Sequence, residues 1–459
     1  MVSGSRSRVG FQWRHAAAFT TLMSLGFIAA VADVRSPVPS ILWLLGAGAA
    51  AIASPPAALA SILVGLPWVF HPLRLWGGQF TALEIGAVVG SLAIGARGLL
   101  SLFQRRQPSA LIRLLSPGAI TWPAAALLIV ATASLVTVAD PSHRTESLRE
   151  FRTVILEPLA VFALCRWCFV SPCARRWAAV TFVGAGAAVA LVALGEVTLG
   201  ANVLVADGAP RARVTYPHPN NLALYLERVS LFALGWAASV VTWGDRRGWI
   251  TGAAGVVTLA GTMATFSRGA LLAVAVGLAV IATVVGSRRA WIALGGGLGF
   301  LVVLLLVLAR SRLLATGAEG GESTRMLIWR SSLRMLQDHP VFGVGLDQFL
   351  YQYWRRYVEP AGWAERYTSH PHNLLLDVWL RLGILGVVTA SWLAAAVTGL
   401  IRSSGLRRPY RGDLAVGSFA ALSAGLAHGL VDNAFFLPDL AVMTWFFVGL
   451  IEAEVADRP

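Results

Sequence analysis

The sequence predicts an all-α integral membrane protein: a polytopic bundle of about 12–14 transmembrane helices with a helical extracytoplasmic loop domain. Of its 459 residues, 56% are hydrophobic and only 13% are charged, and the mean hydropathy is +0.68. Soluble domains carry about 25% charged residues. Apolar runs of helix length recur along the whole chain. These observations exclude soluble, disordered, collagen-like and disulfide-stapled proteins.

Fourteen apolar segments are candidate spans, because a helix needs roughly 20 apolar residues to cross a bilayer. They cover residues 15–33, 39–53, 56–70, 80–103, 118–138, 151–170, 177–199, 220–243, 248–266, 269–286, 290–310, 374–401, 413–431 and 437–454. The second and third are short and nearly continuous, which gives the range of spans. The first ends in a motif that resembles a signal-peptide cleavage site, but we expect it to stay uncleaved because many spans follow.

Arginines in short loops predict the orientation, since positive charge is enriched on the cytoplasmic side. They follow the fourth, sixth, eighth, tenth and twelfth spans: Arg105, Arg106, Arg113, Arg175, Arg176, Arg246, Arg247, Arg288, Arg289, Arg402, Arg407, Arg408 and Arg411. With fourteen spans, all five loops share one side with both termini. We therefore expect both termini to be cytoplasmic in a multi-pass protein.

The loops of the other side carry most of the histidines and many of the acids. They cover residues 71–79, 139–150, 200–219, 267–268, 311–373 and 432–436. Neither ATP nor sugar nucleotides are available outside the cytoplasm, so group transfer there needs an activated donor, most plausibly a lipid-linked one. The predicted parts are N-terminal helices (1–140), central helices with a donor-binding break (141–310), the extracytoplasmic loop domain (311–373) and C-terminal helices (374–459).

The motif His370-Pro371-His372-Asn373 opens the twelfth span. Asn373 is a suitable helix cap, and the helix N-terminus beside His372 disfavours the imidazolium ion. A neutral imidazole there can accept a proton from a hydroxyl, although capping or interfacial roles remain open. Asp377 is about 140° around the helix. It is better placed to pair with the arginine four residues later, so we assign no His–Asp pair.

Two arginines are candidate anion ligands. Residues 323–336 predict an amphipathic helix, capped by Ser323 or Thr324, with Arg325 in the middle of its apolar face. That face consists of Met326, Ile328, Trp329, Leu333, Met335 and Leu336. A buried arginine needs an anion, although Arg325 is close enough to the helix end to snorkel outward. Arg268 lies at a tight break between two spans, where phosphate binding and simple interfacial anchoring are both open.

The motif His218-Pro219-Asn220-Asn221 opens the eighth span and resembles the later His-Pro-His-Asn motif. Only the later copy has a base at its third position. We expect His218 and Asn221 to line a substrate cleft with His370, Asn373, Arg152 and Asp432. For Arg149, intrahelical pairing with Glu150 and Glu146 is expected. His428, Asp432 and Asn433 mark the end of the thirteenth span, where polar contacts between helices are an alternative.

Several kinds of site are disfavoured. The chain contains no P-loop, no GxGxxG after a strand, no HExxH and no DxD pair in these loops, and three clustered cysteines do not form a zinc motif. We therefore predict no metal and no cofactor. All 37 basic residues are arginines, which suit phosphate or carboxylate. They are dispersed between spans, so nucleic-acid binding is disfavoured.

The ordered motifs resemble those of the bacterial O-antigen ligase and polymerase superfamily. His372-Asn373, nine residues, Gly383, two residues and Gly386 resemble the H-[NSQ]-x9-G-x-x-G signature, although Val387 departs from the usual next residue. The break at Arg268 and the helix with Arg325 are similar as well. The resemblance covers roughly residues 150–450. It implies a GT-C-like membrane glycosyltransferase of the bacterial inner membrane, with its active site outside the cytoplasm.

The resemblance also implies roles for individual residues. The donor would be a glycan on undecaprenyl diphosphate, Arg268 and Arg325 would hold the diphosphate in place of a metal, and His372 would be the base. The acceptor would be lipid A-core for a ligase, or a second lipid-linked glycan for an O-antigen or exopolysaccharide polymerase. A transporter of lipid-linked glycans is the rival from another class, and it predicts more ionisable groups at mid-span.

Overall fold

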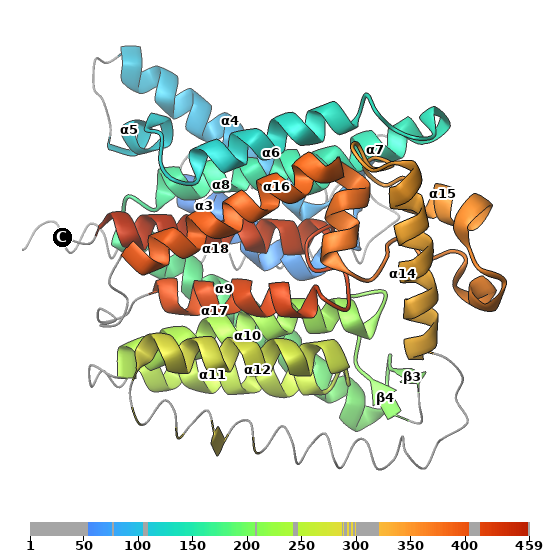
Figure 1. Cartoon of the computed structure of the whole chain (residues 1–459). Coiled ribbons are helices and arrows are strands. Elements are labelled where there is room, and N and C mark those ends of the chain that lie inside the picture. The colour runs from blue at the N-terminus through green and yellow to red at the C-terminus, as the bar shows by residue number, and fades with distance from the viewer. Residues whose placement is uncertain are drawn as a thin grey trace, which may run out of the picture.

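The computed structural model confirms an all-α polytopic membrane protein (Figure 1). It describes residues 54–75, 78–103, 109–206, 209–241, 247–286, 321–403 and 414–457, with isolated positions between 288 and 299. Within this part of the chain, four helices are long and apolar enough to cross a membrane: α4 (Ala82–Phe103), α9 (Pro172–Leu199), α12 (Arg268–Val285) and α16 (Leu374–Ser403). The predicted spans at 15–33 and 39–53, and most of 290–310, lie outside the described residues. The total of 12–14 spans therefore stays a prediction.

The other elements of the first half are mostly shorter helices. They are α3 (Pro55–Gly65), η1 (Leu66–Trp68), β1 (Leu73–Leu75), β2 (Gly78–Phe80), α5 (Ser109–Leu115), α6 (Thr121–Ser134), η2 (Pro141–His143), α7 (Arg144–Glu150), η3 (Phe151–Leu156) and α8 (Glu157–Cys168). Local chemistry sets the helix ends, as in α9. Ser171 caps its first turn, Pro172 occupies the first helical position, and Gly200 ends it in a left-handed conformation.

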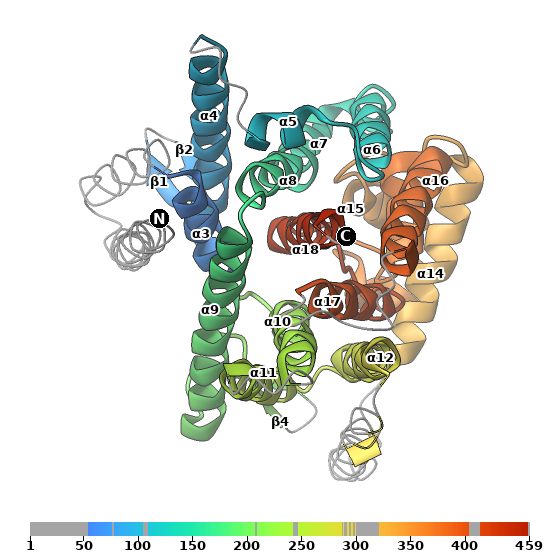
Figure 2. The same ribbon diagram turned by 90° about the vertical axis from the view of Figure 1, so that its left-hand side faces the viewer.

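The second half contains further helices besides α12 and α16, described above. Its elements are β3 (Leu204–Ala206), β4 (Ala209–Arg211), α10 (Pro219–Val241), α11 (Arg247–Met263), α14 (Gly321–Asp338), α15 (Phe349–Gln352), η4 (Tyr353–Tyr357), η5 (Pro360–Glu365), α17 (Leu414–His428) and α18 (Pro438–Ala456). Each hairpin, β1–β2 and β3–β4, is a two-stranded antiparallel ladder. Figure 2 shows α18 surrounded by α8, α16, α17 and α10.

The centre of the bundle is packed by aromatic rings and by glycine. The rings of Phe182, Phe232, Phe446 and Phe447 contact one another with centroids 5.3–6.3 Å apart. Helices α10 and α17 approach closely at Gly417. A Cβ on this residue would lie 2.2 Å from the Phe232 carbonyl oxygen, so the contact requires glycine. Small residues allow such contact between membrane helices, where packing and not the hydrophobic effect holds helices together.

Helix α14 crosses the ends of the bundle helices and has its own small core (Figures 1 and 2). Its buried residues pack with α15, η4 and α16 in a cluster of Ile328, Met335, Leu336, Val344, Phe349, Tyr353 and Leu380. The helix begins at Gly321, so the prediction that Ser323 or Thr324 caps it was wrong. Part of the predicted apolar face was also wrong. Met326 and Leu333 are about half exposed, and the buried stripe passes through Ser331 and Ser332 instead.

The described loops gather at two opposite ends of the bundle (Figure 1). At one end, the Ala139 amide donates to the Val344 carbonyl and His71 bonds the Thr215 carbonyl. At the other end, Asp457 pairs with Arg113 and Arg175. Figure 1 shows α7, α14, α15 and the β3–β4 hairpin together at the first end, which we call the loop end.

Candidate active site

A buried carboxylate at the loop end gathers three side chains from distant parts of the chain. Asp432, in the connection between α17 and α18, is 5% exposed. The ring N–H of His372 at Nδ1 donates to its Oδ1 across 3.0 Å, and His370 Nε2 lies 3.4 Å from the same oxygen. Asn220 donates its amide N–H to the other oxygen, Oδ2, across 3.2 Å. The structure therefore contains a His–Asp pair that the sequence analysis did not assign.

The His370–Asn373 segment is positioned by the start of α16. Asn373 caps this helix as predicted, since its Oδ1 accepts the Leu376 amide at 3.1 Å. Its Nδ2 donates to the Leu430 carbonyl at 3.1 Å, which ties the helix start to the end of α17. His372 adopts a left-handed backbone conformation with φ of 53°, unusual for a residue other than glycine. Such a conformation is found most often where the surrounding structure enforces it, as at functional sites.

Arg381 fixes the other side of the same segment. It pairs with Asp377 at 2.7 Å, as predicted from the helical spacing. It also pairs with Glu150 of α7, and its NH2 lies 3.4 Å from the Ser369 carbonyl. The predicted pairing of Arg149 with Glu150 and Glu146 was wrong, because Arg149 pairs with Asp347 at 3.2 Å. Arg149 and Glu150, neighbours in α7, therefore pair with Asp347 and Arg381, two residues that lie far away in the sequence.

The first glycine of the signature has a backbone role. Gly383 interrupts α16 with φ of 70° and ψ of −173°. A Cβ there would lie 2.2 Å from the Val341 carbonyl oxygen, and the next amide, Ile384 N–H, donates to that oxygen at 3.0 Å. Only glycine allows both this conformation and this close approach. The kink lets the loop after α14 dock on α16 beside the histidine segment.

The electrostatics of the cluster favour an ionised carboxylate at Asp432. Burial alone would raise the pKa of Asp432, but hydrogen bonds from His370 and His372 hold that pKa well below its ordinary value. Burial lowers the pKa of His370, although the bond to Asp432 opposes this shift. Burial, and then the charge of Arg211, lower the pKa of His218. At neutral pH, Asp432 is therefore an anion that accepts hydrogen bonds.

The two similar motifs converge on the same carboxylate. Their third residues, Asn220 and His372, each donate to one oxygen of Asp432. Arg211 holds the earlier motif, since its NH2 donates to Asn220 Oδ1 at 2.6 Å and its Nε to the Thr265 carbonyl at 2.8 Å. The sequence analysis missed Arg211 as a site residue. No local signal singles it out, because Arg213 lies in the same predicted outer loop and most other predicted outer loops hold arginines as well.

The two candidate anion-binding arginines both lie at the loop end, on separate elements. Arg268 is exposed at the first position of α12, three residues after the carbonyl that Arg211 bonds. Arg325 is half-buried on α14, one turn before Trp329 on the same face. The indole N–H of Trp329 donates to the Pro371 carbonyl at 2.9 Å, between the two histidines. Arg325 thus lies on the helix that contacts the histidine segment, and Arg268 follows shortly after the residue whose carbonyl Arg211 bonds.

The remaining predicted cleft residues lie in different surroundings. His218 is exposed, and its Nδ1 accepts the Asn220 amide at 3.1 Å. Asn221 is half-buried one position further on, so the Asp432 contact is made by its neighbour. Arg152 pairs with Glu84 at 2.6 Å and, less closely, with Glu157 at 3.7 Å, on α4 and α8. The contacts described for Arg152 therefore do not include the Asp432 cluster.

His428 forms a separate buried pair inside the bundle. Its Nδ1 lies 2.8 Å from Glu227 Oε2. Both side chains are almost fully buried, so this pair links α17 to α10. A Cβ on Gly269 would lie 2.3 Å from His428 Nε2, so the start of α12 packs directly on the ring. His428 therefore makes a polar contact between helices, the alternative named above, whereas Asp432 contacts His370, His372 and Asn220 at the loop end.

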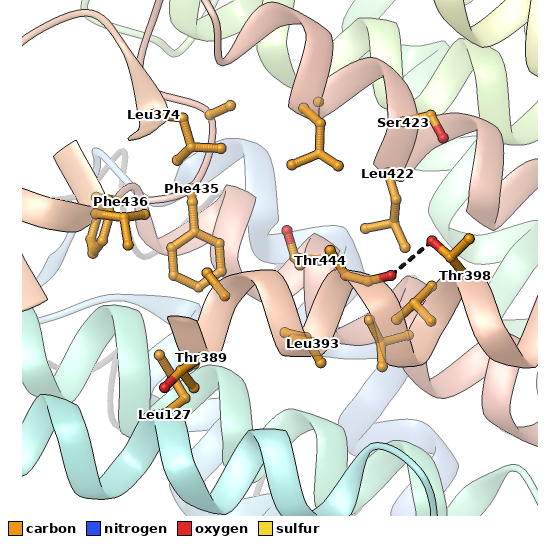
Figure 3. A pocket seen from close by; sticks show the side chains of 18 of the residues that line it. Leu127, Leu374, Thr389, Leu393, Thr398, Leu422, Ser423, Phe435, Phe436 and Thr444 are labelled. Carbon is orange, nitrogen blue, oxygen red and sulfur yellow. Dashed lines mark hydrogen bonds between the residues drawn. The ribbon is translucent and has the colours of Figure 1, made fainter. Parts of the chain in front are cut away.

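An apolar cavity of about 170 Å³ lies between α16 and α17 and ends near the cluster. Figure 3 shows Leu374, Phe435 and Phe436 at one end of this cavity, with Thr398 and Ser423 at the other. Leu374 follows the His370–Asn373 segment, and Phe435 lies three residues after Asp432. The cavity therefore begins near residues that adjoin the Asp432 cluster in the sequence and continues between α16 and α17.

Part of the chain that contains this site is similar to known proteins. Residues 253–391 match the family model described as O-antigen ligase. Over this segment, about a third of the chain, the protein is similar to O-antigen ligases. The resemblance predicted from the motifs is thereby confirmed. The chain is also similar to an O-antigen ligase of Salmonella typhimurium, with 31% identity over 86 residues, which is 17% of this chain and 21% of that protein. The chain thus matches about a fifth of that relative's length.

The matched segment contains only part of the cluster. It includes the two histidines, Arg268 and Arg325, whereas Arg211, Asn220 and Asp432 lie outside it. Asp432, which contacts His372, therefore follows the matched segment, and Asn220, which contacts Asp432, precedes it.

Proposed function

We propose that this protein transfers a glycan from undecaprenyl diphosphate to an acceptor hydroxyl on the extracytoplasmic side of the bacterial inner membrane. In this proposal the transfer inverts the anomeric carbon and needs no metal ion. The observation that carries the proposal is the pairing of His372 with the buried carboxylate of Asp432. The similarity to O-antigen ligases supports it.

The hydrogen bond to Asp432 sets the tautomer of His372. With the proton on Nδ1 donated to Asp432, Nε2 carries a lone pair and can accept a proton. Nε2 lies 3.3 Å from the Thr368 hydroxyl, so a hydroxyl group can already approach it. The side chain of His372 is 24% exposed, which leaves room for an acceptor. A base oriented by a buried carboxylate is the arrangement of the serine-protease triad, here directed at a sugar hydroxyl.

Transfer then proceeds as one balanced displacement. The acceptor oxygen forms a bond to the anomeric carbon while its proton moves to His372 Nε2. The bond between that carbon and the diphosphate oxygen breaks, and its electron pair leaves with undecaprenyl diphosphate. Because attack and departure occur on opposite faces of the sugar, the configuration inverts. The ionised Asp432 stabilises the imidazolium ion that forms.

Arg268 and Arg325 are assigned to the leaving diphosphate. Negative charge increases on this group as the bond breaks, and guanidinium groups stabilise phosphate oxygens with paired hydrogen bonds. Arg268 begins α12, where unpaired backbone N–H groups add further positive potential. Arg325 lies on the face of α14 that contacts the Pro371 carbonyl through Trp329. Two arginines from different elements would replace the charge of a metal ion.

The apolar cavity between α16 and α17, of about 170 Å³, suits a short segment of the donor's polyprenyl chain next to the diphosphate. It is lined almost entirely by aliphatic and aromatic side chains, and it ends beside the cluster. A chain held there would leave its diphosphate at the loop end, near the proposed base. The acceptor, whether lipid A-core or a second lipid-linked glycan, would approach from the α14 side.

The test uses the purified protein in detergent with EDTA, an undecaprenyl-diphosphate glycan and the two acceptors in parallel. Wild type should transfer glycan to one of them, and that acceptor distinguishes a ligase from a polymerase. His372→Ala, Arg268→Ala and Arg325→Ala should each abolish transfer. Arg330→Ala is the matched control, because Arg330 is exposed on the same helix and should be dispensable.

Other outcomes would contradict the proposal. Undiminished transfer by His372→Ala would eliminate this residue as the base. If no acceptor is used but liposomes containing the protein translocate the lipid-linked glycan, the transporter alternative is correct.

A further inference from the structure

The cluster around Asp432 has the composition of a metal site. His370 Nε2 and His372 Nδ1 lie 3.4 and 3.0 Å from Asp432 Oδ1, and the three groups offer ligand atoms within 4.8 Å of one another. A zinc ion with tetrahedral bonds of about 2.0–2.1 Å needs ligand atoms roughly 3.3 Å apart. Two of the three separations thus match this requirement to within a few tenths of an ångström.

The second ring of contacts also matches that of a metal site. In protein metal sites, the remaining polar atom of each ligand is usually hydrogen-bonded, which fixes ring orientation and tautomer. Here each remaining atom has a neighbour at hydrogen-bonding distance: Ser369 Oγ for His370 at 3.0 Å, Thr368 Oγ1 for His372 at 3.3 Å and Asn220 Nδ2 for Asp432 at 3.2 Å. The histidines are 21% and 24% exposed, so a fourth coordination position can be filled by water.

We propose that His370, His372 and Asp432 bind a divalent transition-metal ion of the zinc type, and that the bound ion blocks glycan transfer. Two imidazoles and one carboxylate are the ligand set that zinc accepts at sites with an open position. The binding part stands on this geometry alone. The blocking part rests on the proposed function, because it requires His372 to be the base.

The block follows from the single proton of the neutral imidazole. When Nδ1 of His372 coordinates a metal, that proton must reside on Nε2. Nε2 then donates a hydrogen bond and has no lone pair for the proton of the acceptor hydroxyl. The metal also engages the Asp432 carboxylate that otherwise stabilises the imidazolium ion. Metal binding and base catalysis at His372 are therefore mutually exclusive.

The binding test uses full-length protein with a histidine-free affinity tag, stripped with EDTA and then dialysed. Zn²⁺ is titrated in by calorimetry, and Co²⁺ is used as a spectroscopic probe of the ligands. Wild type should bind one Zn²⁺ at this site. Asp432→Asn and His370→Gln should lose that binding. Asn220→Ala, which keeps all three ligands, should weaken it by about 10–100-fold.

His339→Gln is the matched control, since it removes a histidine of the same loop domain that lies outside the cluster. It should bind Zn²⁺ as wild type does. Each variant is first checked for a monodisperse elution profile and a cooperative melt. Absence of Zn²⁺ binding in wild type, or binding that persists in folded Asp432→Asn and His370→Gln, overturns the metal site.

The functional test adds Zn²⁺ to the transfer assay in place of EDTA. Transfer should stop when the site is filled and return when a chelator is added. Stimulation by Zn²⁺ overturns the block, since the ion would then assist the reaction. If wild type binds Zn²⁺ but transfers no glycan under any condition, the proposed function fails while the metal site stands.

Discussion

Two helix starts in this protein carry nearly the same motif and contact the same carboxylate, yet they offer different chemistry. At α10, Asn220 donates to Asp432 Oδ2 and is itself held by Arg211. At α16, His372 donates to Oδ1. An asparagine amide has no titratable nitrogen, whereas imidazole keeps a second nitrogen that can accept a proton. We infer that the α10 copy supports the carboxylate and the α16 copy uses it.

The largest effect is expected from Asp432→Asn, because it acts on both helix starts at once. The amide of asparagine can no longer accept from every donor that Asp432 serves, and it favours the wrong tautomer of His372. In the serine-protease triad the equivalent change lowers kcat by about 10⁴, and we expect a loss approaching that size. Since Asp432 acts through His372, the loss should be in kcat and not in KM. An unchanged kcat would contradict the role of Asp432 in orienting His372.

Asn220→Ala should have a smaller effect, confined to the α10 start. It removes two hydrogen bonds to charged groups, the one donated to Asp432 and the one accepted from Arg211, and each contributes about 1.5–3 kcal/mol to stability. Thermal melts should show this loss, with transfer reduced by about tenfold or less. A double-mutant cycle with Arg211→Ala then measures whether the two side chains act together. A loss of transfer as large as that of Asp432→Asn would contradict a purely supporting role for Asn220.

Gly383→Ala tests the device that only the α16 start possesses. The conformation of Gly383, with positive φ and ψ of −173°, is essentially restricted to glycine and costs a residue with a Cβ about 1–3 kcal/mol. The close Val341 carbonyl adds to that cost. Melts should therefore show a destabilisation of at least this size. Gly399→Ala, in the same helix with open space around it, should be neutral or slightly stabilising. Equal stability of the two variants would remove the proposed reason for the signature glycine.

The smallest effect is expected on the pH dependence of stability, and it tests the shifted pKa of His370. Burial lowers the folded-state pKa of His370 below its unfolded value of about 6.5, against the opposing effect of Asp432. Below that value the unfolded chain binds more protons, so stability should fall as pH drops from about 7.5 to 5. His370→Gln should lose less over this range, and His339→Gln should follow wild type. A parallel fall for all three proteins would contradict the shift.

The sequence predicts most of the helices and one half of the site. Apolar length predicts the long helices, helical spacing predicts the Arg381–Asp377 pair, and the residue type at the start of α16 predicts the Asn373 cap. The contacts of Asp432 could not be predicted, because they join residues about 60 and 210 positions apart in the chain. Nothing local distinguishes such a carboxylate from a helix-end acid.

Two wrong predictions share this cause. Arg149 has acidic neighbours at helical spacing, but tertiary packing supplies Asp347 instead. The helix with Arg325 was assigned a face from composition, whereas its buried stripe includes two serines and leaves Met326 outside. At a membrane surface, apolar residues can face outward, so periodicity alone does not identify the protein-facing side.

The central claim is that His372, and not its counterpart Asn220, accepts the proton. The most direct test compares transfer by wild type and His372→Asn in EDTA, since asparagine tolerates the left-handed backbone at this position and copies the α10 motif. The account predicts a folded protein whose transfer rate falls by about 10²–10⁴, while His218→Gln stays within a few-fold of wild type. Transfer by His372→Asn at the wild-type rate would contradict the account.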